Sequence, residues 1–213
     1  MNGGVLYTGL VCPDASYVHL PLIAIVHPLP ADWQRLVEAV ATVGDADILL
    51  FTSRNAVSWW TKAMQTAGSA WTNARVVAIG NVTAEALNDS GATNITLACH
   101  DDSYGVIETF HGFNDRGRVV VPRSDLAFNI IPDGLRQLGY AVECLTAYRT
   151  VMPAGISAVS LDGISTIVFT SPSTIDNFVR LYGCLPADKT FVTRGCVTRA
   201  HLNSVLAAQQ KNL

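Results

Sequence analysis

The sequence lacks any apolar run long enough to cross a membrane. Its longest uninterrupted apolar runs, such as 48–51 and 119–121, have the length of a β-strand, whereas a membrane-spanning helix needs about 20 apolar residues. No basic residue precedes the short apolar patch at the amino terminus, so this segment does not match a secretory signal. We therefore expect a cytoplasmic protein without a membrane partner.

Cysteine pairs at metal-ligand spacing are also absent. The number of cysteines is odd, their spacing is wide and no C-x-x-C pair occurs, which argues against a disulfide framework and against a zinc site. The five histidines show no metal-ligand spacing either. We expect no metal and interpret the cysteines as buried free thiols. They are Cys12, Cys99, Cys144, Cys184 and Cys196.

Charge is scarce, and lysine is scarcer than arginine. Charged residues make up 15% of the chain, the net charge is −3, and the 14 basic residues are scattered. A chain without a basic surface is not expected to bind nucleic acid. Only three of the 14 are lysines, and the guanidinium group of arginine suits recognition of carboxylates or phosphates. With 49% hydrophobic residues over 213 positions, the chain can form one large domain or two small ones.

Short β-branched runs alternate with amphipathic stretches along most of the chain. This rhythm is typical of an α/β protein in which helices join parallel strands. The runs begin at positions 5, 22, 47, 75, 118, 166 and 190. Between them, Asp32 is expected to cap a helix through about Val43, and Asp102 or Ser103 a helix through His111.

Two motifs occur twice. FTSRNAV at 51–57 recurs as FTSPSTI at 169–175, and VVAIGNVTAEAL at 76–87 recurs as FVTRGCVTRAHL at 191–202. Each copy reads as a strand, the FTS turn, a helix, a second strand, a G-x-x-T turn and a second helix. The repetition predicts two similar α/β domains.

A third correspondence links the start of the chain to its middle, where VLYTG at 5–9 resembles VVPRS at 120–124. One domain should therefore be discontinuous, with residues 1–19 packed against 152–213. A cleft between two similar domains is a common ligand site. The predicted boundaries are 1–19 and 152–213 for the discontinuous domain, 27–144 for the inserted domain, and 20–26 and 145–151 for two connecting strands.

Hydroxyl side chains follow the strands in both copies. Ser53 and Ser171 stand where a helix begins, so that capping alone explains them. The same helix starts can also offer amides and hydroxyls to a carboxylate or phosphate. Thr83 and Thr198 repeat this placement in the G-x-x-T turns, where a single copy is more often only a turn. Neither copy fits a nucleotide-binding loop, but the duplication favours anion binding.

Tyr148 lies in the second connecting segment, within TAYRTV. A tyrosine in such a segment can be a packing residue. Alternatively, its hydroxyl can donate a proton inside the cleft, because a phenol with a pKa of about 10 is protonated at neutral pH.

Five segments together resemble the uroporphyrinogen-III synthase family: FTSRNAV, VVAIGNVTAEAL, LRQLGYAVECLTAYRT, IVFTSPSTIDNF and GCVTRAHL, between about Asp47 and Leu202. The resemblance implies two flavodoxin-like parallel-sheet domains joined by a two-stranded connector. It also implies that the linear tetrapyrrole hydroxymethylbilane binds in the cleft, without a metal or an organic cofactor. The reaction removes the terminal hydroxyl as water, inverts the last pyrrole ring through a spiro intermediate and closes the ring to uroporphyrinogen III.

On this resemblance, Tyr148 is the candidate catalytic residue, and we expect a monomer. The substrate carboxylates would meet Ser53, Arg54, Thr83, Arg123, Ser171, Ser173 and Thr198. A rival interpretation is a non-catalytic two-domain protein that binds a tetrapyrrole or a small anion.

The discontinuous domain departs from the family pattern at two places. Only residues 10–16 separate its first strand from the first connecting segment, whereas 125–140 fill the equivalent stretch of the other copy. Its opening helix should therefore be missing or reduced to a turn. The chain also stops soon after the helix near Val197, where the family continues with another strand and helix. We expect this domain to be truncated.

Overall fold

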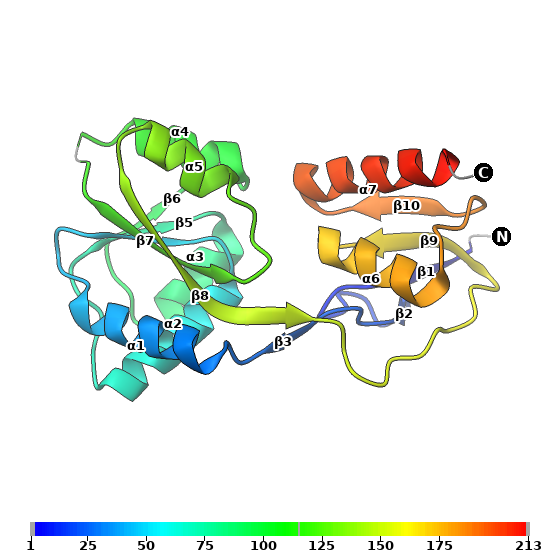
Figure 1. Ribbon diagram of the computed structural model, residues 1–213, viewed down its shortest axis with the longest axis horizontal. Coiled ribbons are helices and arrows are strands. Elements are labelled where there is room, and N and C mark those ends of the chain that lie inside the picture. Colours follow the sequence, from blue (N-terminus) through cyan, green and yellow to red (C-terminus); the bar gives the residue numbers. More distant parts are fainter. Residues whose placement is uncertain (1–2, 115, 212–213) are drawn as a thin grey trace. The chain divides into compact units, whose positions relative to one another are not determined.

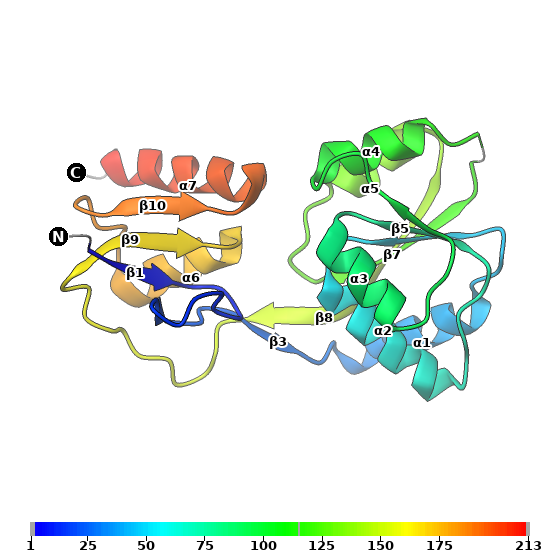
Figure 2. The ribbon, with the colours of Figure 1, turned by 180° about the vertical axis from the view of Figure 1, so that it is seen from behind.

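The structure is a computed structural model that describes residues 3–114 and 116–211. The chain forms two compact units (Figures 1 and 2). The discontinuous unit comprises Met1–Ile25 and Thr150–Leu213, and the inserted unit comprises Val26–Arg149. None of the described helices combines the length and the apolar character that a membrane span requires.

The inserted unit is built on a six-stranded sheet in the order β3-β8-β7-β4-β5-β6. The pairs β8–β7, β7–β4, β4–β5 and β5–β6 are parallel. The strands are β3 (Ala24–Val26), β4 (Ile48–Phe51), β5 (Arg75–Ala78), β6 (Ile95–Leu97), β7 (Arg118–Ser124) and β8 (Ala141–Val151). The helices are α1 (Pro30–Thr42), α2 (Arg54–Ala67), α3 (Asn81–Asp89), α4 (Ser103–His111) and α5 (Ile130–Gln137).

Helices cover both faces of this sheet (Figure 1). Strand β4 reads ILLF and is buried along its whole length, as expected for a central parallel strand with two covered faces. On one face, Leu50 and Val77 pack with Phe110 of α4 and Leu135 of α5. On the other, Phe51 contacts Trp60 of α2 edge to face, with ring centroids 6.1 Å apart.

The discontinuous unit has a four-stranded parallel sheet in the order β10-β9-β1-β2. Strand β1 pairs with β9, so that Leu6 lies beside Ile167. The amino-terminal strand thus lies in the sheet of the carboxyl-terminal segment, as the internal repeat predicts. The elements are β1 (Gly4–Tyr7), β2 (Val18–His19), β9 (Ile164–Phe169), β10 (Thr190–Thr193), α6 (Pro172–Tyr182) and α7 (Gly195–Gln210).

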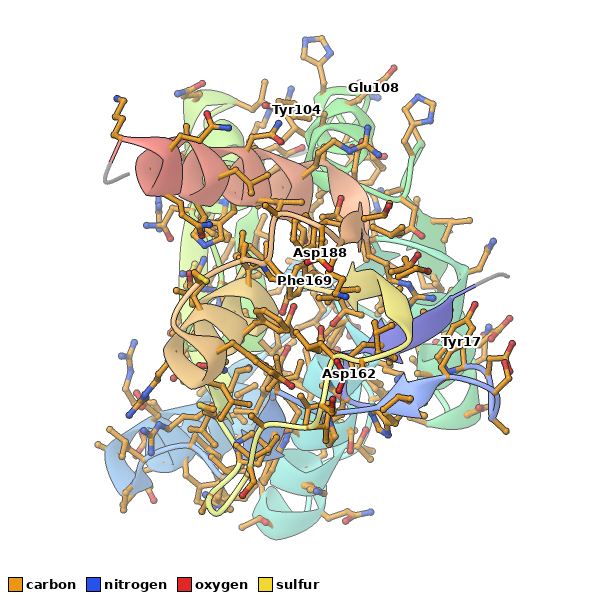
Figure 3. The ribbon with its side chains drawn as sticks, turned by 90° about the vertical axis from the view of Figure 1, so that its right-hand side faces the viewer. Tyr17, Tyr104, Glu108, Asp162, Phe169 and Asp188 are labelled. Atoms are coloured by element: carbon orange, nitrogen blue, oxygen red, sulfur yellow. The ribbon has the colours of Figure 1, made fainter. Side chains whose placement is uncertain are left out.

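Aromatic side chains fill the core of the discontinuous unit. Phe169, labelled in Figure 3, is fully buried and packs edge to face on Phe178, with ring centroids 5.5 Å apart. It also stacks on Phe191 of β10, at 5.9 Å. Residues 8–17, between β1 and β2, contain no helix, whereas α5 joins β7 to β8 in the inserted unit. The helix that the sequence analysis expected to be missing or reduced to a turn is therefore absent from residues 8–17.

The register of β1 corrects one part of the repeat. If FTS at 51–53 corresponds to FTS at 169–171, then Ile48 corresponds to Thr166. Val119 pairs with Ile48, and Val5 pairs with Thr166. Val5 is therefore the counterpart of Val119. The match of VLYTG to VVPRS paired Val5 with Val120 instead. A shift of one residue exchanges the two faces of a strand, so this correction decides which side chains face which helices.

Two further expectations need correction, and one is confirmed. Leu29, not Asp32, occupies the N-cap of α1, because Pro30 is the first helical residue; Asp32 lies in the first turn, where its charge favours the positive helix end. Asp102 caps α4 as predicted, accepting from the amides of Tyr104 and Gly105.

The cysteines are free but not buried. Cys12 and Cys144 are half-buried, and Cys99, Cys184 and Cys196 are exposed.

Candidate functional site

The candidate residues of the inserted unit gather at the carboxyl ends of neighbouring parallel strands. Ser53 follows β4, and Gly80 and Thr83 follow β5. Tyr148 lies near the end of β8, opposite Ser124 at the end of β7. In open parallel sheets this edge is where ligands bind, because the following helices point their free amides toward it.

Ser53 caps a helix, as the sequence predicts, and also contacts the candidate tyrosine. It is the N-cap of α2, and its Oγ accepts a hydrogen bond of 3.1 Å from the amide of Ala56. The same Oγ lies 3.1 Å from the phenolic oxygen of Tyr148. The start of α2 therefore fixes the serine, and the serine in turn fixes the position of the tyrosine hydroxyl.

Tyr148 is buried, with 7% of its surface exposed. Burial raises the pKa of its phenol above the ordinary value; the hydrogen bond with Ser53 lowers that pKa, and the negative charge of Asp125 raises it. The phenol is therefore fully protonated at neutral pH. The ring is packed, as the first interpretation of this residue requires, and the hydroxyl is paired with Ser53; proton donation by that hydroxyl stays a prediction.

The two candidate arginines differ in their surroundings. Arg54 is the exposed first residue of α2, directly beside Ser53. Arg123 instead donates to the carbonyl of Phe128, at 3.2 Å, and to Oδ1 of Asn129, at 2.9 Å. Its guanidinium holds the loop that follows β7. Sequence reasoning missed this role because nothing in the motif shows where the following loop folds.

Thr83 is the third residue of α3 and is buried, with 4% exposed. Its amide donates to the carbonyl of Gly80, the N-cap of the helix, at 3.1 Å. A Cβ at Gly80 would collide with the carboxylate of Asp101. The glycine therefore allows an acidic side chain to approach the positive end of α3, a contact that the sequence analysis did not foresee.

The discontinuous unit carries the other three candidates. Ser171 is the N-cap of α6, Pro172 is its first residue, and the Oγ atoms of Ser171 and Ser173 lie 2.9 Å apart. The amide of Ser171 also donates to Oγ1 of Thr174, a fully buried residue that the sequence analysis did not single out. The S-x-x-T spacing of a capping box could have identified it. Thr198 is the fourth residue of α7 and is 4% exposed.

Titratable side chains do not assemble into a metal centre in the part of the chain that the structure describes. Within residues 3–114 and 116–211, no three histidine, cysteine, aspartate or glutamate side chains lie close enough together to hold a metal ion. Besides the carboxylates of Asp101 and Asp125, the candidate edge presents hydroxyls, amides and guanidinium ions. These groups suit hydrogen bonding to carboxylates and transfer of a phenolic proton.

Comparison with curated relatives gives matches to one family. A protein of Methanothermobacter thermautotrophicus that carries uroporphyrinogen-III synthase as a provisional name is 28% identical over 162 residues, which are 72% of this chain and 64% of the relative. The uroporphyrinogen-III synthase of Synechococcus elongatus is 25% identical over 175 residues, 78% of this chain and 66% of the relative. In both cases the chain covers just under two thirds of the relative's length.

Solved structures share the fold. A mutant uroporphyrinogen III synthase from the extremely thermophilic bacterium Thermus thermophilus has a TM-score of 0.69 at 18% identity, covering 95% of this chain and 88% of that one. The synthetase from Helicobacter pylori 26695 has a TM-score of 0.59 at 17% identity, with the same coverage. The family model described as uroporphyrinogen-III synthase HemD matches residues 14–206. The chain therefore belongs to the uroporphyrinogen-III synthase family.

Proposed function

We propose that this chain converts hydroxymethylbilane into uroporphyrinogen III, inverting the last pyrrole ring and releasing water. The observation that carries the proposal is the pairing of Ser53 with Tyr148 at the carboxyl edge of the inserted unit's sheet, in a chain that matches this family over residues 14–206. Loss of a hydroxyl group as water requires a proton donor, and a protonated phenol at this edge can supply that proton.

The chemistry asks for orientation more than for strong acids or bases. The electrons of the pyrrole ring expel the terminal hydroxyl, which leaves as water once it gains a proton. We propose that Tyr148 donates that proton and that Ser53 keeps the phenol in place. The ring must then be attacked at its substituted position rather than at its free one, and this selectivity depends on how the chain is held.

We propose that the substrate's carboxylates are held by hydroxyls and amides at helix starts. In the inserted unit these are Ser53, Thr83 and the exposed Arg54; in the discontinuous unit they are Ser171, Ser173 and Thr198. The net charge of −3 means that the attraction must be local to these groups. We propose no cofactor for this chemistry.

Product analysis tests the proposal. The protein is incubated with freshly prepared hydroxymethylbilane, the products are oxidised, and the type I and type III porphyrin isomers are separated by chromatography. We expect the type III isomer to predominate with the protein and the type I isomer without it. Saturable binding of the substrate with type I product alone would instead indicate a non-catalytic tetrapyrrole-binding protein.

A further inference from the structure

The loop of residues 125–129, which joins β7 to α5 (Figure 1), begins beside the candidate catalytic tyrosine. The amide of Asp125 donates to the carbonyl of Tyr148 at 3.1 Å. The carboxylate of Asp125 also lies 3.8 Å from the guanidinium of Arg149, the residue after Tyr148. The first residue of the loop is thus fixed to β8 at the same edge where Tyr148 meets Ser53.

Polar contacts also fix the rest of the loop. Ser124 Oγ accepts from the amide of Leu126 at 3.2 Å, and its carbonyl accepts from the amide of Ala127 at 3.2 Å. At the far end, the Arg123 guanidinium binds the Phe128 carbonyl and the Asn129 side chain. The loop therefore has a defined backbone path although it lies at the surface.

Two of the exposed residues of this loop are apolar, and they stand between the exposed polar residues Asp125 and Asn129. Leu126 and Phe128 are each 54% exposed. A single exposed apolar residue needs no explanation. Here two of them lie in one five-residue loop, whose backbone path is fixed by polar contacts and whose first residue is hydrogen-bonded to the backbone of Tyr148.

We propose that Leu126 and Phe128 contact the faces of the substrate's pyrrole rings, and that Arg123 is a positioning residue that holds the loop for this contact. This inference rests on the proposed function. A linear tetrapyrrole has flat apolar rings and charged carboxylates, so its recognition needs both kinds of surface. An aromatic side chain packs well on such a ring, while the hydroxyls and amides of the edge meet the carboxylates. Arg123 is thereby reassigned from substrate binding to support of the loop.

The test compares steady-state kinetics of Leu126→Ala, Phe128→Ala and the double variant with wild type, using hydroxymethylbilane as substrate. We expect the KM to rise about three- to tenfold for Phe128→Ala, the effect of losing one aromatic contact, and further in the double variant. Leu97→Ala is the matched control. Leu97 is also an exposed leucine, 45% accessible, on the outer strand β6, which β4 and β5 separate from β7; its KM should stay at the wild-type value.

A double-mutant cycle separates the two roles open to Arg123. Arg123→Met keeps the aliphatic stem and removes the guanidinium. If Arg123 acts through the loop, adding this change to the Leu126→Ala/Phe128→Ala pair should change KM by less than about twofold. If instead the increase in KM from Arg123→Met multiplies the increase from the Leu126→Ala/Phe128→Ala pair, Arg123 contacts the substrate itself. That result would overturn its positioning role. Thermal melting checks that each variant is folded.

The outcomes distinguish this inference from the proposed function. Type III product from wild type with an unchanged KM in the double variant overturns the loop contact and leaves the function standing. If wild type makes no type III product, binding of uroporphyrin III is titrated by tryptophan fluorescence instead. Weaker binding in Phe128→Ala than in Leu97→Ala then supports the loop contact, and equal binding or none at all refutes it.

Discussion

The contact between Ser53 and Tyr148 joins two residues that are 95 positions apart in the sequence. Removing only the phenolic hydroxyl tests the role proposed for it. Tyr148→Phe should lower the rate of type III formation about tenfold or more if the phenol donates a proton, because the buried ring keeps its packing. The rate is measured in the isomer assay, with the unfolding midpoint as the control for structure. Unchanged kinetics and an unchanged isomer ratio would reduce Tyr148 to a packing residue.

Burial of the same phenol also affects stability at high pH. The pKa of Tyr148 is raised in the folded chain, so above about pH 10 the unfolded phenol loses its proton while the folded one keeps it. The unfolded state then binds fewer protons, and the free energy of unfolding must fall as the pH rises through about 10. Below that pH this contribution is constant.

Urea denaturation from about pH 9 to about pH 11 measures this effect. The decline should be shallower in Tyr148→Phe than in wild type. Burial also raises the pKa of Tyr182, so a smaller decline should persist in the variant, and Tyr182→Phe is the comparison that accounts for it. Equal slopes in wild type and Tyr148→Phe would show that the phenol does not retain its proton in the folded state.

At the scale of single elements, Gly105 lies within α4 and Gly112 is its C-cap. The same substitution at these two positions can therefore be compared. A Cβ at Gly105 would collide with the backbone of His100, whereas a Cβ at Gly112 would meet only Thr109 O at 3.4 Å. Gly105→Ala should lower the free energy of unfolding by about 1–3 kcal/mol, the usual cost of overpacking. Gly112→Ala should be nearly neutral. Thermal or urea denaturation of both variants gives the comparison, and equal effects would contradict the packing of α4 described here.

Most elements could be predicted from the sequence because their apolar runs are buried. The strand at β4 is a continuous ILLF run, and its burial follows directly from that. The two strands that the sequence analysis missed, β2 and β6, are short, and their residues are exposed or half-buried. Such strands carry too short an apolar run to be recognised, and their partners in the sheet contribute more to their formation than burial of their own side chains.

The candidate site was predictable as a set of positions but not as a set of contacts. The duplicated turns identify Ser53 and Thr83 from local pattern alone, since each stands where a strand gives way to a helix. The pairing of Ser53 with Tyr148 depends on the order of strands, which no local pattern contains. The contact of Arg123 with the Phe128 carbonyl depends on the path of a loop, which the sequence does not show. The sequence analysis therefore considered Arg123 only as a substrate-binding candidate.

At the scale of the whole molecule, the two units share one strand order to different extents. The order β8-β7-β4-β5 of the inserted unit matches β2-β1-β9-β10 of the discontinuous unit, but within residues 3–114 and 116–211 only the inserted unit continues with a further strand, β6. Leu50 and Val77 are buried under α4 and α5. Val168, the counterpart of Leu50, is half-buried, and Val192, the counterpart of Val77, is 46% exposed. Among the described residues, the discontinuous unit thus buries less of its sheet and gains less stability from it.

The same duplication predicts that binding is distributed over both units. Thr83→Ala and Thr198→Ala each remove one hydroxyl from the first turns of a helix and leave the backbone amides in place. Each should weaken substrate binding by about 1 kcal/mol, typical of one neutral hydrogen bond. Because the two residues belong to different units, the double variant should show the sum of both effects. Binding is measured through KM in the isomer assay, with circular dichroism to show that the variants are folded. Loss of all turnover in either folded single variant would mean that this threonine is a catalytic centre and that binding is not distributed.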